Sequence, residues 1–517
     1  MTAPCLVVSA SAGGSESAGG RFSLGIAQPG LDGVDPLEVG HHRALDLKIR
    51  GHPRRLAAES AKLSFMGEAQ QVDVVVVGLG VGGEEVAGRL AEAGLTVVGV
   101  EHTLVGGECP YWGCIPTKMM IRAGNALAEA RRIPGLAGTS TVQPDWSPVA
   151  KRIRDEATDT WDDKVAVDRF TGKGGHFVRG RAVVAGPGRI NVEDQEYVAG
   201  RGLVIATGST ATVPPIEGLA GTPFWTNREA IEAENLPATL VVLGGGAIGL
   251  ELSQVMARFG VQVTIVEGGD RLLAMEEPES SELAADVLAR DGVQARTGVR
   301  AQQVAHQNGR FQVTLSDGST VSADQLLVAT GRAARVEGLG LETIGLDPTH
   351  RYLQTDDRMR AADKVWAVGD VTGNGGFTHM AMYEADIAVR DILGQGGPAA
   401  DYRARPRVTF LDPEIGAVGM TEKQAREAGI EVQIGYVKTS QTSRGFVHGP
   451  GNDGFIKVIA SQGKLVGATS AGPAGGEVLG ALSLAIHAEI PISTLLSTIW
   501  AYPTFHRGIG DALKTLR

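Results

Sequence analysis

The stretch VDVVVVGLGVGG, residues 72–83, joins a short apolar run that predicts a β-strand to a turn rich in glycine. A helix-compatible segment follows this turn and stops at Gly94, a residue type that often ends helices. A second predicted strand, residues 95–100, leads directly to Glu101. The order of strand, glycine turn, helix, strand and acid predicts a βαβ unit that binds a mononucleotide.

The same arrangement recurs at residues 240–249, which read LVVLGGGAIG. The helix-compatible segment here stops at Gly260, and a strand over residues 261–266 leads to Glu267. From the first glycine to the acid there are 23 positions in both copies, and from the third glycine to the helix-ending glycine there are 11. Because 72 of the 517 residues are glycine, a single G-x-G-x-x-G match would carry little weight. Two units that agree at every step predict two dinucleotide sites.

Each glycine turn predicts a binding site for a pyrophosphate. Glycine lets the backbone approach the phosphates, which then lie at the positive N-terminal end of the helix, and the acid accepts hydrogen bonds from a ribose 2′-hydroxyl. Glu267 would repel a 2′-phosphate and no arginine follows before Arg271, so NADH is the expected nucleotide and NADPH the alternative. The predicted cofactor-binding residues are Gly78, Gly80, Gly83 and Glu101 in the first unit and Gly244, Gly246, Gly249 and Glu267 in the second.

Two of the three cysteines, Cys109 and Cys114, lie in the segment GGECPYWGCIPTK at residues 106–118. They could be buried thiols that happen to be close, but their position directly after a nucleotide-binding unit favours a redox pair. Positions i and i+5 of an ideal helix lie about 8–9 Å apart, too far for a disulfide. We therefore expect an irregular segment, which Pro110 and Gly113 permit. A zinc site is not expected, because no second cysteine pair exists to complete it.

This segment resembles the C-x4-C-I-P-x-K signature of the class I flavoprotein disulfide reductases, which include dihydrolipoamide dehydrogenase, glutathione reductase and mercuric reductase. The similarity extends from about residue 70 to the C-terminus. It implies that the unit at Gly78 binds FAD and that the unit at Gly244 binds the nicotinamide nucleotide, NAD(H) or NADP(H).

The resemblance also implies roles for four side chains. Cys109 is the interchange thiol that meets the substrate, and Cys114 faces the flavin and forms a charge-transfer complex with it. Lys118 matches the lysine near flavin N5, and Glu251 matches its acidic partner near the nicotinamide.

Further stretches match the family in the same order. The A-T-G triplets at residues 206–208 and 329–331 resemble its two crossings between domains and add Thr207, Gly208 and Gly331 to the expected cofactor site. WAVGD at residues 366–370 resembles the second FAD motif, in which Asp370 would bind the ribityl chain. The helix expected near residues 378–385 would point its positive end at the flavin and stabilise the anionic reduced ring.

The expected fold class is α/β, with two Rossmann-like nucleotide-binding domains, for FAD and NAD(P), and a C-terminal α+β dimerisation domain. We place the first part of the FAD-binding domain at residues 66–216, the NAD(P)-binding domain at 217–336, the second part of the FAD-binding domain at 337–403, and the dimerisation domain at 404–517. Residues 1–65 are expected to be a disordered tail or a misassigned start. In relatives the active site is completed across a two-fold interface, so we expect a homodimer.

The C-terminal segment WAYPTFHR, residues 500–507, departs from the family signature H-x-H-P-T-x-S-E. Tyr502 replaces the acid/base histidine and Arg507 replaces the glutamate that orients it. A tyrosine with a pKa near 10 is no base at neutral pH, although its hydroxyl can donate a hydrogen bond. His506 is either a displaced acid/base or a packing histidine at the interface. The vicinal C-terminal cysteines of mercuric reductases are missing from residues 512–517.

The composition of the chain limits which binding partners and which cellular location are expected. A formal charge of −11 disfavours nucleic acid and anionic lipid, and no apolar run approaches the roughly 18–20 residues of a membrane helix. Three cysteines make no disulfide scaffold, which favours a cytoplasmic location. No metal ligand set is expected.

We expect an enzyme that passes electrons from NAD(P)H through FAD to the Cys109–Cys114 disulfide and on to a small disulfide or related acceptor. One alternative is a quinone or metal-ion reductase of the same fold, whose acceptor needs no histidine base. A more remote alternative is a redox sensor or complex subunit with little turnover. The expected catalytic residues are Cys109, Cys114, Lys118, Glu251, Tyr502 and His506.

Overall fold

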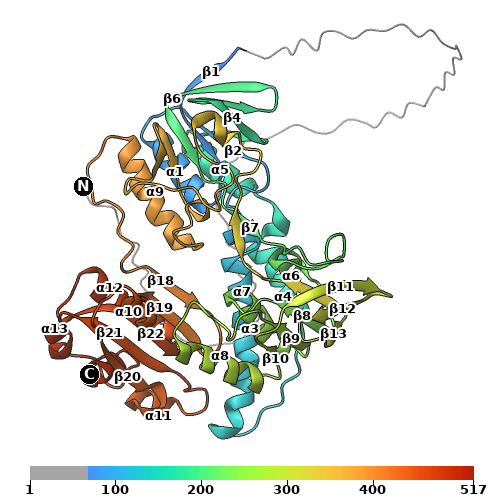
Figure 1. Cartoon of the computed structure of the whole chain (residues 1–517), viewed down its shortest axis with the longest axis vertical. Coiled ribbons are helices and arrows are strands. Elements are labelled where there is room, and N and C mark those ends of the chain that lie inside the picture. Colours follow the sequence, from blue (N-terminus) through green and yellow to red (C-terminus); the bar gives the residue numbers. More distant parts are fainter. Residues whose placement is uncertain (1–67) are drawn as a thin grey trace, which may run out of the picture. The chain divides into compact units, whose positions relative to one another are not determined.

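The structure, a computed structural model, describes residues 68–517 of the chain. The expectation for residues 1–65 therefore lies outside the described residues. The strands form sheets of eight, four, three, two and five strands. Figure 1 shows how helices pack against these sheets. Within residues 68–517, no helix is both long enough and apolar enough to cross a membrane.

The largest sheet contains the first predicted βαβ unit. Its main path runs, in spatial order, through β16 (Arg360–Ala362), β17 (Val365–Ala367), β6 (Gln195–Ile205), β1 (Gln70–Val77), β2 (Val97–Glu101) and β3 (His176–Arg179). A hairpin of β4 (Ala182–Gly186) and β5 (Arg189–Val192) pairs with β6, and β17, β6, β1, β2 and β3 run parallel. The sequence predicts the second strand over residues 95–100. In the structure this strand, β2, begins two residues later, at Val97, and includes Glu101.

Both faces of this sheet are buried, which explains the unbroken apolar run of β1. Val74 and Val76 pack on the face covered by α1 (Val81–Glu92) and α9 (Thr378–Ile392), which lie side by side in Figure 1. Val75 and Val77 pack on the opposite face with the β4–β5 hairpin. The helix expected near residues 378–385 is therefore α9, and it continues to Ile392 because its apolar face continues.

The second βαβ unit forms a smaller parallel sheet. Its strands, in spatial order, are β10 (Gln294–Arg296), β9 (Gln262–Val266), β8 (Thr239–Leu243) and β14 (Gln325–Val328). The helices α6 (Asn227–Glu232), α7 (Ala247–Arg258) and α8 (Pro278–Arg290) accompany it, and β11 (Ala301–Gln307), β12 (Arg310–Leu315) and β13 (Thr320–Ala323) form an antiparallel sheet. The short strands β7 (Ser209–Ala211) and β15 (Arg332–Ala334) pair with each other directly after the two A-T-G triplets.

The C-terminal part is an antiparallel sheet with helices on it. Its strands, in spatial order, are β18 (Pro406–Thr409), β19 (Glu414–Gly419), β22 (Lys464–Gly472), β21 (Phe455–Ser461) and β20 (Gln433–Lys438). Its helices are α10 (Glu422–Glu427), α11 (Ser443–His448), α12 (Gly475–His487), α13 (Ile492–Ser497) and α14 (Arg507–Leu513). The structure therefore confirms an α/β chain with two Rossmann-like units and a C-terminal α+β domain.

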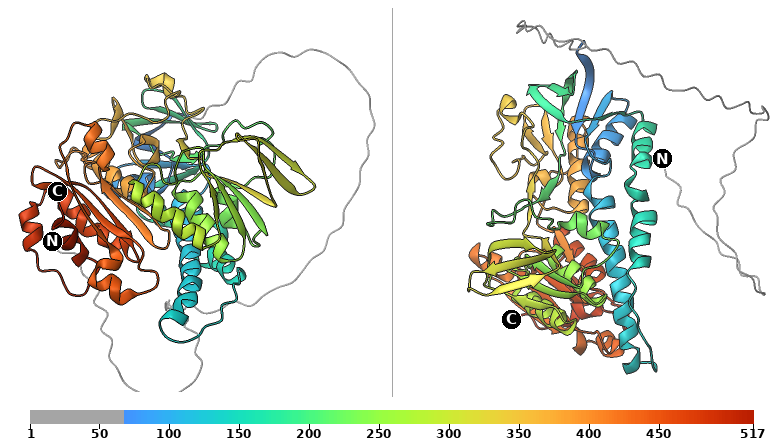
Figure 2. Two further views of the ribbon diagram at one scale, coloured as in Figure 1. Left: turned by 60° about the horizontal axis from the view of Figure 1, so that its bottom comes forward. Right: turned by 90° about the vertical axis from the view of Figure 1, so that its right-hand side faces the viewer.

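A long helix carries the redox segment into the second unit. α3 (Cys114–Arg132) follows the short α2 (Glu108–Tyr111) and packs along α7. The side view of Figure 2 shows α3 as a long cyan helix. The helices α4 (Ser147–Arg152) and α5 (Lys164–Gly172) return the chain to β3. The redox segment is thus fixed between the two nucleotide-binding units.

A buried ion cluster joins the second unit to the C-terminal sheet. Lys457 Nζ on β21 lies 2.9 Å from Glu277 Oε2, 2.9 Å from Glu279 Oε1 and 3.0 Å from Glu422 Oε2. The lysine side chain is only 4% exposed. Burial disfavours its charged form, but the hydrogen bonds to the three carboxylates outweigh burial and raise the pKa of Lys457.

We predict that Lys457→Met lowers the free energy of unfolding by about 3–5 kcal/mol, because it leaves the buried carboxylate of Glu277 without a counter-charge. Urea unfolding followed by circular dichroism measures the change. Lys464→Met is the matched control, since Lys464 and Glu489 form an exposed pair at 3.2 Å that is expected to contribute about 0–1 kcal/mol. Equal losses in both variants would contradict the prediction.

Candidate active site

The two glycine turns have the same geometry. Gly78 and Gly244 adopt positive φ values of 93° and 112°. A side chain at either position would collide with the carbonyl of the alanine that begins an A-T-G triplet, Ala206 or Ala329. A side chain at Gly83 or Gly249 would collide with the carbonyl of the first glycine of its own turn. These four glycines are therefore required by packing.

The middle glycines face open space instead. A Cβ at Gly80 would be 4.0 Å from its nearest neighbour, and a Cβ at Gly246 would have no described atom within 4 Å. A cradle with bare backbone at the start of a helix fits a pyrophosphate. The hydroxyl of Thr207 is buried and has no hydrogen-bond partner among residues 68–517, which also fits a bound group at the first turn.

The two acids are tied to these turns. Glu101 Oε2 accepts from Leu79 N at 2.9 Å, and Glu267 Oε2 accepts from Gly245 N at 2.6 Å. Each carboxylate thus stands beside its glycine turn at the end of the second strand, the position from which it would reach a ribose hydroxyl. Gly269 N donates to the other oxygen of Glu267 at 2.6 Å.

The segment between the cysteines is irregular, as the spacing argument required. α2 ends at Tyr111, Trp112 and Gly113 leave helical conformation, and α3 begins at Cys114. A side chain at Gly113 would lie 2.9 Å from Glu108 O, so the break requires glycine there. The break places the two thiols beside each other, so that each affects the pKa of the other.

The two thiols are electrostatically unequal. The hydrogen bond to Cys114 and burial raise the pKa of the Cys109 thiol above its ordinary value. The same hydrogen bond lowers the pKa of Cys114 to about 6 and outweighs burial, with smaller contributions from Thr378 and Lys118. Cys114 Sγ lies 3.3 Å from Thr378 Oγ1 at the start of α9. The lowered pKa of Cys114 and the Thr378 hydroxyl beside its sulfur favour Cys114 as the sulfur that carries the negative charge of the reduced pair.

An ion pair lies one helical turn beyond Cys114 along α3. Lys118 Nζ is 2.7 Å from Glu251 Oε2, which projects from α7 and is buried. Phe410 N donates to Glu251 Oε1 at 2.8 Å, and the ring of Phe410 lies 4.5 Å from Lys118 Nζ. The pair joins the redox helix to the helix that follows the second glycine turn.

The remaining predicted residues lie at two other places. Asp370 accepts a hydrogen bond from Ser209 Oγ at 2.5 Å, beside the first A-T-G triplet. Tyr502 is 70% exposed and its ring lies 5.4 Å from the Arg507 guanidinium. His506 precedes α14. Among the described residues neither Tyr502 nor His506 has a hydrogen bond or ion pair with the cysteines, so one chain does not bring them together.

Family models cover almost all of the described chain. Residues 72–385 match pyridine nucleotide-disulphide oxidoreductases, and residues 405–513 match the dimerisation domain of the same proteins. The chain belongs to this family. Its members are FAD-dependent flavoproteins that use a pyridine nucleotide, and the dimerisation domain supports a homodimer. The glycine cradle and the unpartnered Thr207 hydroxyl of the first unit fit such a cofactor.

Known members of the family are similar over most of the chain. Dihydrolipoyl dehydrogenase of Chlorobaculum tepidum is 32% identical over 86% of this chain and 97% of its own length. Mercuric reductase of Staphylococcus aureus is 32% identical over 86% of this chain and 82% of its own length. The solved Cu(II) complex of the HOCl-induced flavoprotein disulfide reductase RclA from Escherichia coli is 27% identical, with a TM-score of 0.77 over 86% of this chain and 99% of RclA.

Three contacts of the site escaped sequence reasoning. Thr378 was expected only to begin a helix, and Phe410 and Ser209 were given no role. They join Cys114, Glu251 and Asp370 across 264, 159 and 161 positions of the chain. No local spacing connects such segments, so only the fold could reveal the contacts.

We predict that the thiolate of Cys114 titrates near pH 6 in the reduced, FAD-loaded protein. Because its pKa is lowered, the thiolate is present above that pH and is lost below it. Thr378→Val removes one hydrogen-bond donor and should move the midpoint to higher pH. The midpoint is read from the long-wavelength absorbance of a thiolate beside oxidised flavin. Thr349→Val, in an exposed loop, is the control, and an equal shift there would contradict the assignment.

Proposed function

We propose that the chain passes electrons from NAD(P)H to the Cys109–Cys114 disulfide and from the resulting dithiol to a small disulfide or related acceptor. Bound FAD supplies the chemistry that links a hydride donor to a dithiol. The observation that carries the proposal is the helix break at Trp112 and Gly113, which places the two thiols beside each other, with Cys114 Sγ 3.3 Å from Thr378 Oγ1 and the pKa of Cys114 lowered to about 6. Such a pair holds the negative charge of the reduced state at one defined sulfur.

The cofactors are assigned by unit. The turn at Gly78 and the acid Glu101 would hold the pyrophosphate and ribose of FAD, and Asp370 would bind the ribityl chain. The turn at Gly244 and the acid Glu267 would hold the nicotinamide nucleotide. Support comes from the open middle glycine of each turn and from the acids hydrogen-bonded beside them.

The protein residues around the cysteines have electrostatic tasks. Lys118 and Glu251 form a charge-neutral pair, so the lysine keeps its position next to the redox helix without an excess charge. Thr378 Oγ1 lies within hydrogen-bonding distance of the Cys114 sulfur and would keep that thiolate at the start of α9, whose positive end favours an anion. Cys109 keeps its proton until an acceptor binds.

NADH is the proposed nucleotide. Glu267 presents a carboxylate where the 2′-phosphate of NADPH would lie. Arg271 could have paired with that phosphate, but its guanidinium donates to Ser281 Oγ at 2.5 Å, to Glu276 O at 2.9 Å and to Ala274 O at 2.8 Å. It is therefore used to hold its own loop.

Two classes of acceptor differ in what they require. Reduction of a small disulfide RSSR gives two RSH and re-forms the Cys109–Cys114 disulfide, and each leaving thiolate must gain a proton. In relatives a histidine of the second subunit supplies this proton, but this chain has Tyr502 there. Phe446, Ile499 and Tyr502, all in the dimerisation domain, are 81%, 97% and 70% exposed, as expected for side chains that a second subunit covers.

A metal-ion or quinone acceptor is therefore a second candidate. Two Cu(II) ions would take one electron each from the dithiol, giving two Cu(I), the Cys109–Cys114 disulfide and two protons, with no leaving thiolate. A quinone would take two electrons and two protons and leave as the hydroquinone. The Tyr502 and Arg507 substitutions favour this class, as does the fact that RclA, a similar protein, was solved as a Cu(II) complex.

We predict that Cys109→Ser lowers NADH-dependent reduction of both small disulfides and Cu(II) by about a hundredfold or more, because the dithiol cannot form. Initial rates with a small disulfide, Cu(II) and a quinone measure this. Cys5→Ser is the matched control and should leave every rate unchanged. Quinone reduction that survives in Cys109→Ser would bypass the cysteines. Full disulfide and Cu(II) activity in that variant would contradict the proposed function.

We also predict that Glu267→Gln raises kcat/KM for NADPH about tenfold while changing that for NADH little. The amide keeps the shape and, with its single oxygen, one of the two backbone hydrogen bonds that Glu267 accepts, but the charge that repels the 2′-phosphate is gone, an effect of about 1.4 kcal/mol. Steady-state kinetics with both nucleotides measure the preference. Glu342→Gln, on an exposed turn, is the control. An unchanged preference in Glu267→Gln would rule out Glu267 as its cause.

A further inference from the structure

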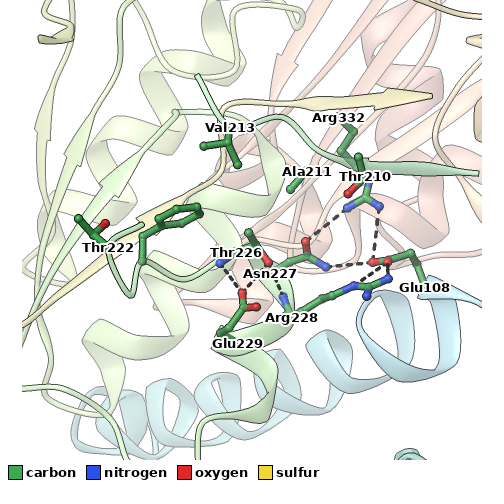
Figure 3. A pocket seen from close by; sticks show the side chains of 11 residues that line it. Glu108, Thr210, Ala211, Val213, Thr222, Thr226, Asn227, Arg228, Glu229 and Arg332 are labelled. Carbon is green, nitrogen blue, oxygen red and sulfur yellow. Dashed lines mark hydrogen bonds and ion pairs between the residues drawn. The ribbon is translucent and has the colours of Figure 1, made fainter. Parts of the chain in front are cut away.

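Three side chains from outside the redox segment converge on Glu108, the residue before Cys109. Figure 3 shows them in the wall of a cavity of about 270 Å³. Arg228 donates to Glu108 Oε1 through two nitrogens, Nε at 2.9 Å and Nη2. Asn227 Nδ2 donates to Glu108 Oε2 at 3.2 Å, and Arg332 Nη2 lies 3.5 Å from the same oxygen.

The other end of the irregular segment, at Trp112, contacts α6, the helix that carries Asn227 and Arg228. The Arg228 guanidinium stacks 4.1 Å above the ring of Trp112, which is almost fully buried. Asn227 Nδ2 donates to Trp112 O at 2.7 Å, and Trp112 Nε1 donates to Glu232 Oε1 at 2.6 Å. We call Asn227, Arg228 and Glu232 the α6 clamp.

The helix of the clamp is itself fixed at its start. Thr226 and Glu229 form a reciprocal capping box, with Thr226 N donating to Glu229 Oε2 at 2.7 Å. A capped first turn keeps the clamp residues in one orientation. The clamp therefore presents a rigid surface to the redox segment.

This arrangement matters because the helix is interrupted between the cysteines. Trp112 and Gly113 leave helical geometry, so the distance between the two sulfurs depends on where each side of the break is held. Glu108 is adjacent to Cys109, and Trp112 lies two positions before Cys114. Anchoring both on α6 fixes the spacing across the break.

We propose that Glu108 and Arg228 are positioning residues that keep the Cys109 thiol beside the Cys114 sulfur, where it stabilises a thiolate on Cys114. The proposal rests on the proposed function only in that this pair is taken to be the redox couple. Neither residue belongs to the C-x4-C-I-P-x-K signature. Arg332 extends the contacts to the expected ribityl site, since its Nε donates to Ser209 Oγ at 2.8 Å and Ser209 Oγ donates to Asp370.

The clamp makes a prediction that charge alone does not. Glu108 is an anion beside the cysteines, so removing its charge by Glu108→Gln would stabilise a nearby thiolate if electrostatics decided. The clamp predicts the reverse, because the amide cannot accept the two-pronged hydrogen bond from Arg228 with the strength of a carboxylate. Both Glu108→Gln and Arg228→Met should therefore destabilise the Cys114 thiolate.

The test uses the FAD-loaded protein reduced with dithiothreitol, so it does not depend on NADH or on any acceptor. The pH midpoint of the long-wavelength thiolate–flavin absorbance is measured for each variant. We expect both variants to raise the midpoint by at least about one pH unit, which lowers the thiolate fraction at pH 7 about twofold or more. Arg228→Lys keeps the charge but loses the fork and the stacking, and should also shift upward.

Matched controls come from the exposed pair Arg152–Glu156, whose Nε and Oε2 atoms are 3.0 Å apart. Arg152→Met and Glu156→Gln should leave the midpoint unchanged. A downward shift in Glu108→Gln, or a wild-type midpoint in Arg228→Lys, would overturn the clamp. Should Arg228→Met fail to fold, the near-isosteric Glu108→Gln decides alone. If the wild type shows no thiolate band at all, the proposed function fails instead.

Discussion

Two thiols five positions apart can meet only where the helix between them is broken, and most of the redox region follows from that break. An unbroken helix would satisfy the backbone by itself, whereas the break at Trp112 and Gly113 draws on outside partners, as where Trp112 O accepts from Asn227 Nδ2. α3, which begins at Cys114, supplies one firm end through its packing on α7. Side chains of α6 supply the other.

The two nucleotide-binding units were predictable because their constraints are local. A positive φ at Gly78, the close approach of Gly83 to the turn and the acid at the end of the next strand all depend on residues less than thirty positions apart. A repeated local pattern can be counted along the chain, and the second unit repeated the first. The apolar run of β1 predicted a strand, and the structure shows why it is apolar throughout: side chains on both faces of this strand are buried.

The contacts that tune the cysteines were not predictable, since they depend on the tertiary arrangement. Nothing in the sequence near Thr378 indicates a thiol partner, and nothing near Arg228 indicates that it stacks on Trp112. The motif names the reacting atoms, but a contact from a distant segment, Thr378, also contributes to the pKa of Cys114. The role of Tyr502 cannot be inferred from one chain, because in relatives the active site is completed by a second subunit.

The buried cluster around Lys457 has a consequence for how nucleotide can enter and leave. It ties the start of α8 to β21, and Arg407 and Glu276 form a further two-pronged pair across the same boundary at 2.6 and 2.8 Å. A hinge that swung the second βαβ unit away would have to separate these ions together. Both contacts therefore oppose a rigid-body hinge motion of this unit away from the C-terminal sheet, so a nucleotide that entered by such a motion would have to break them.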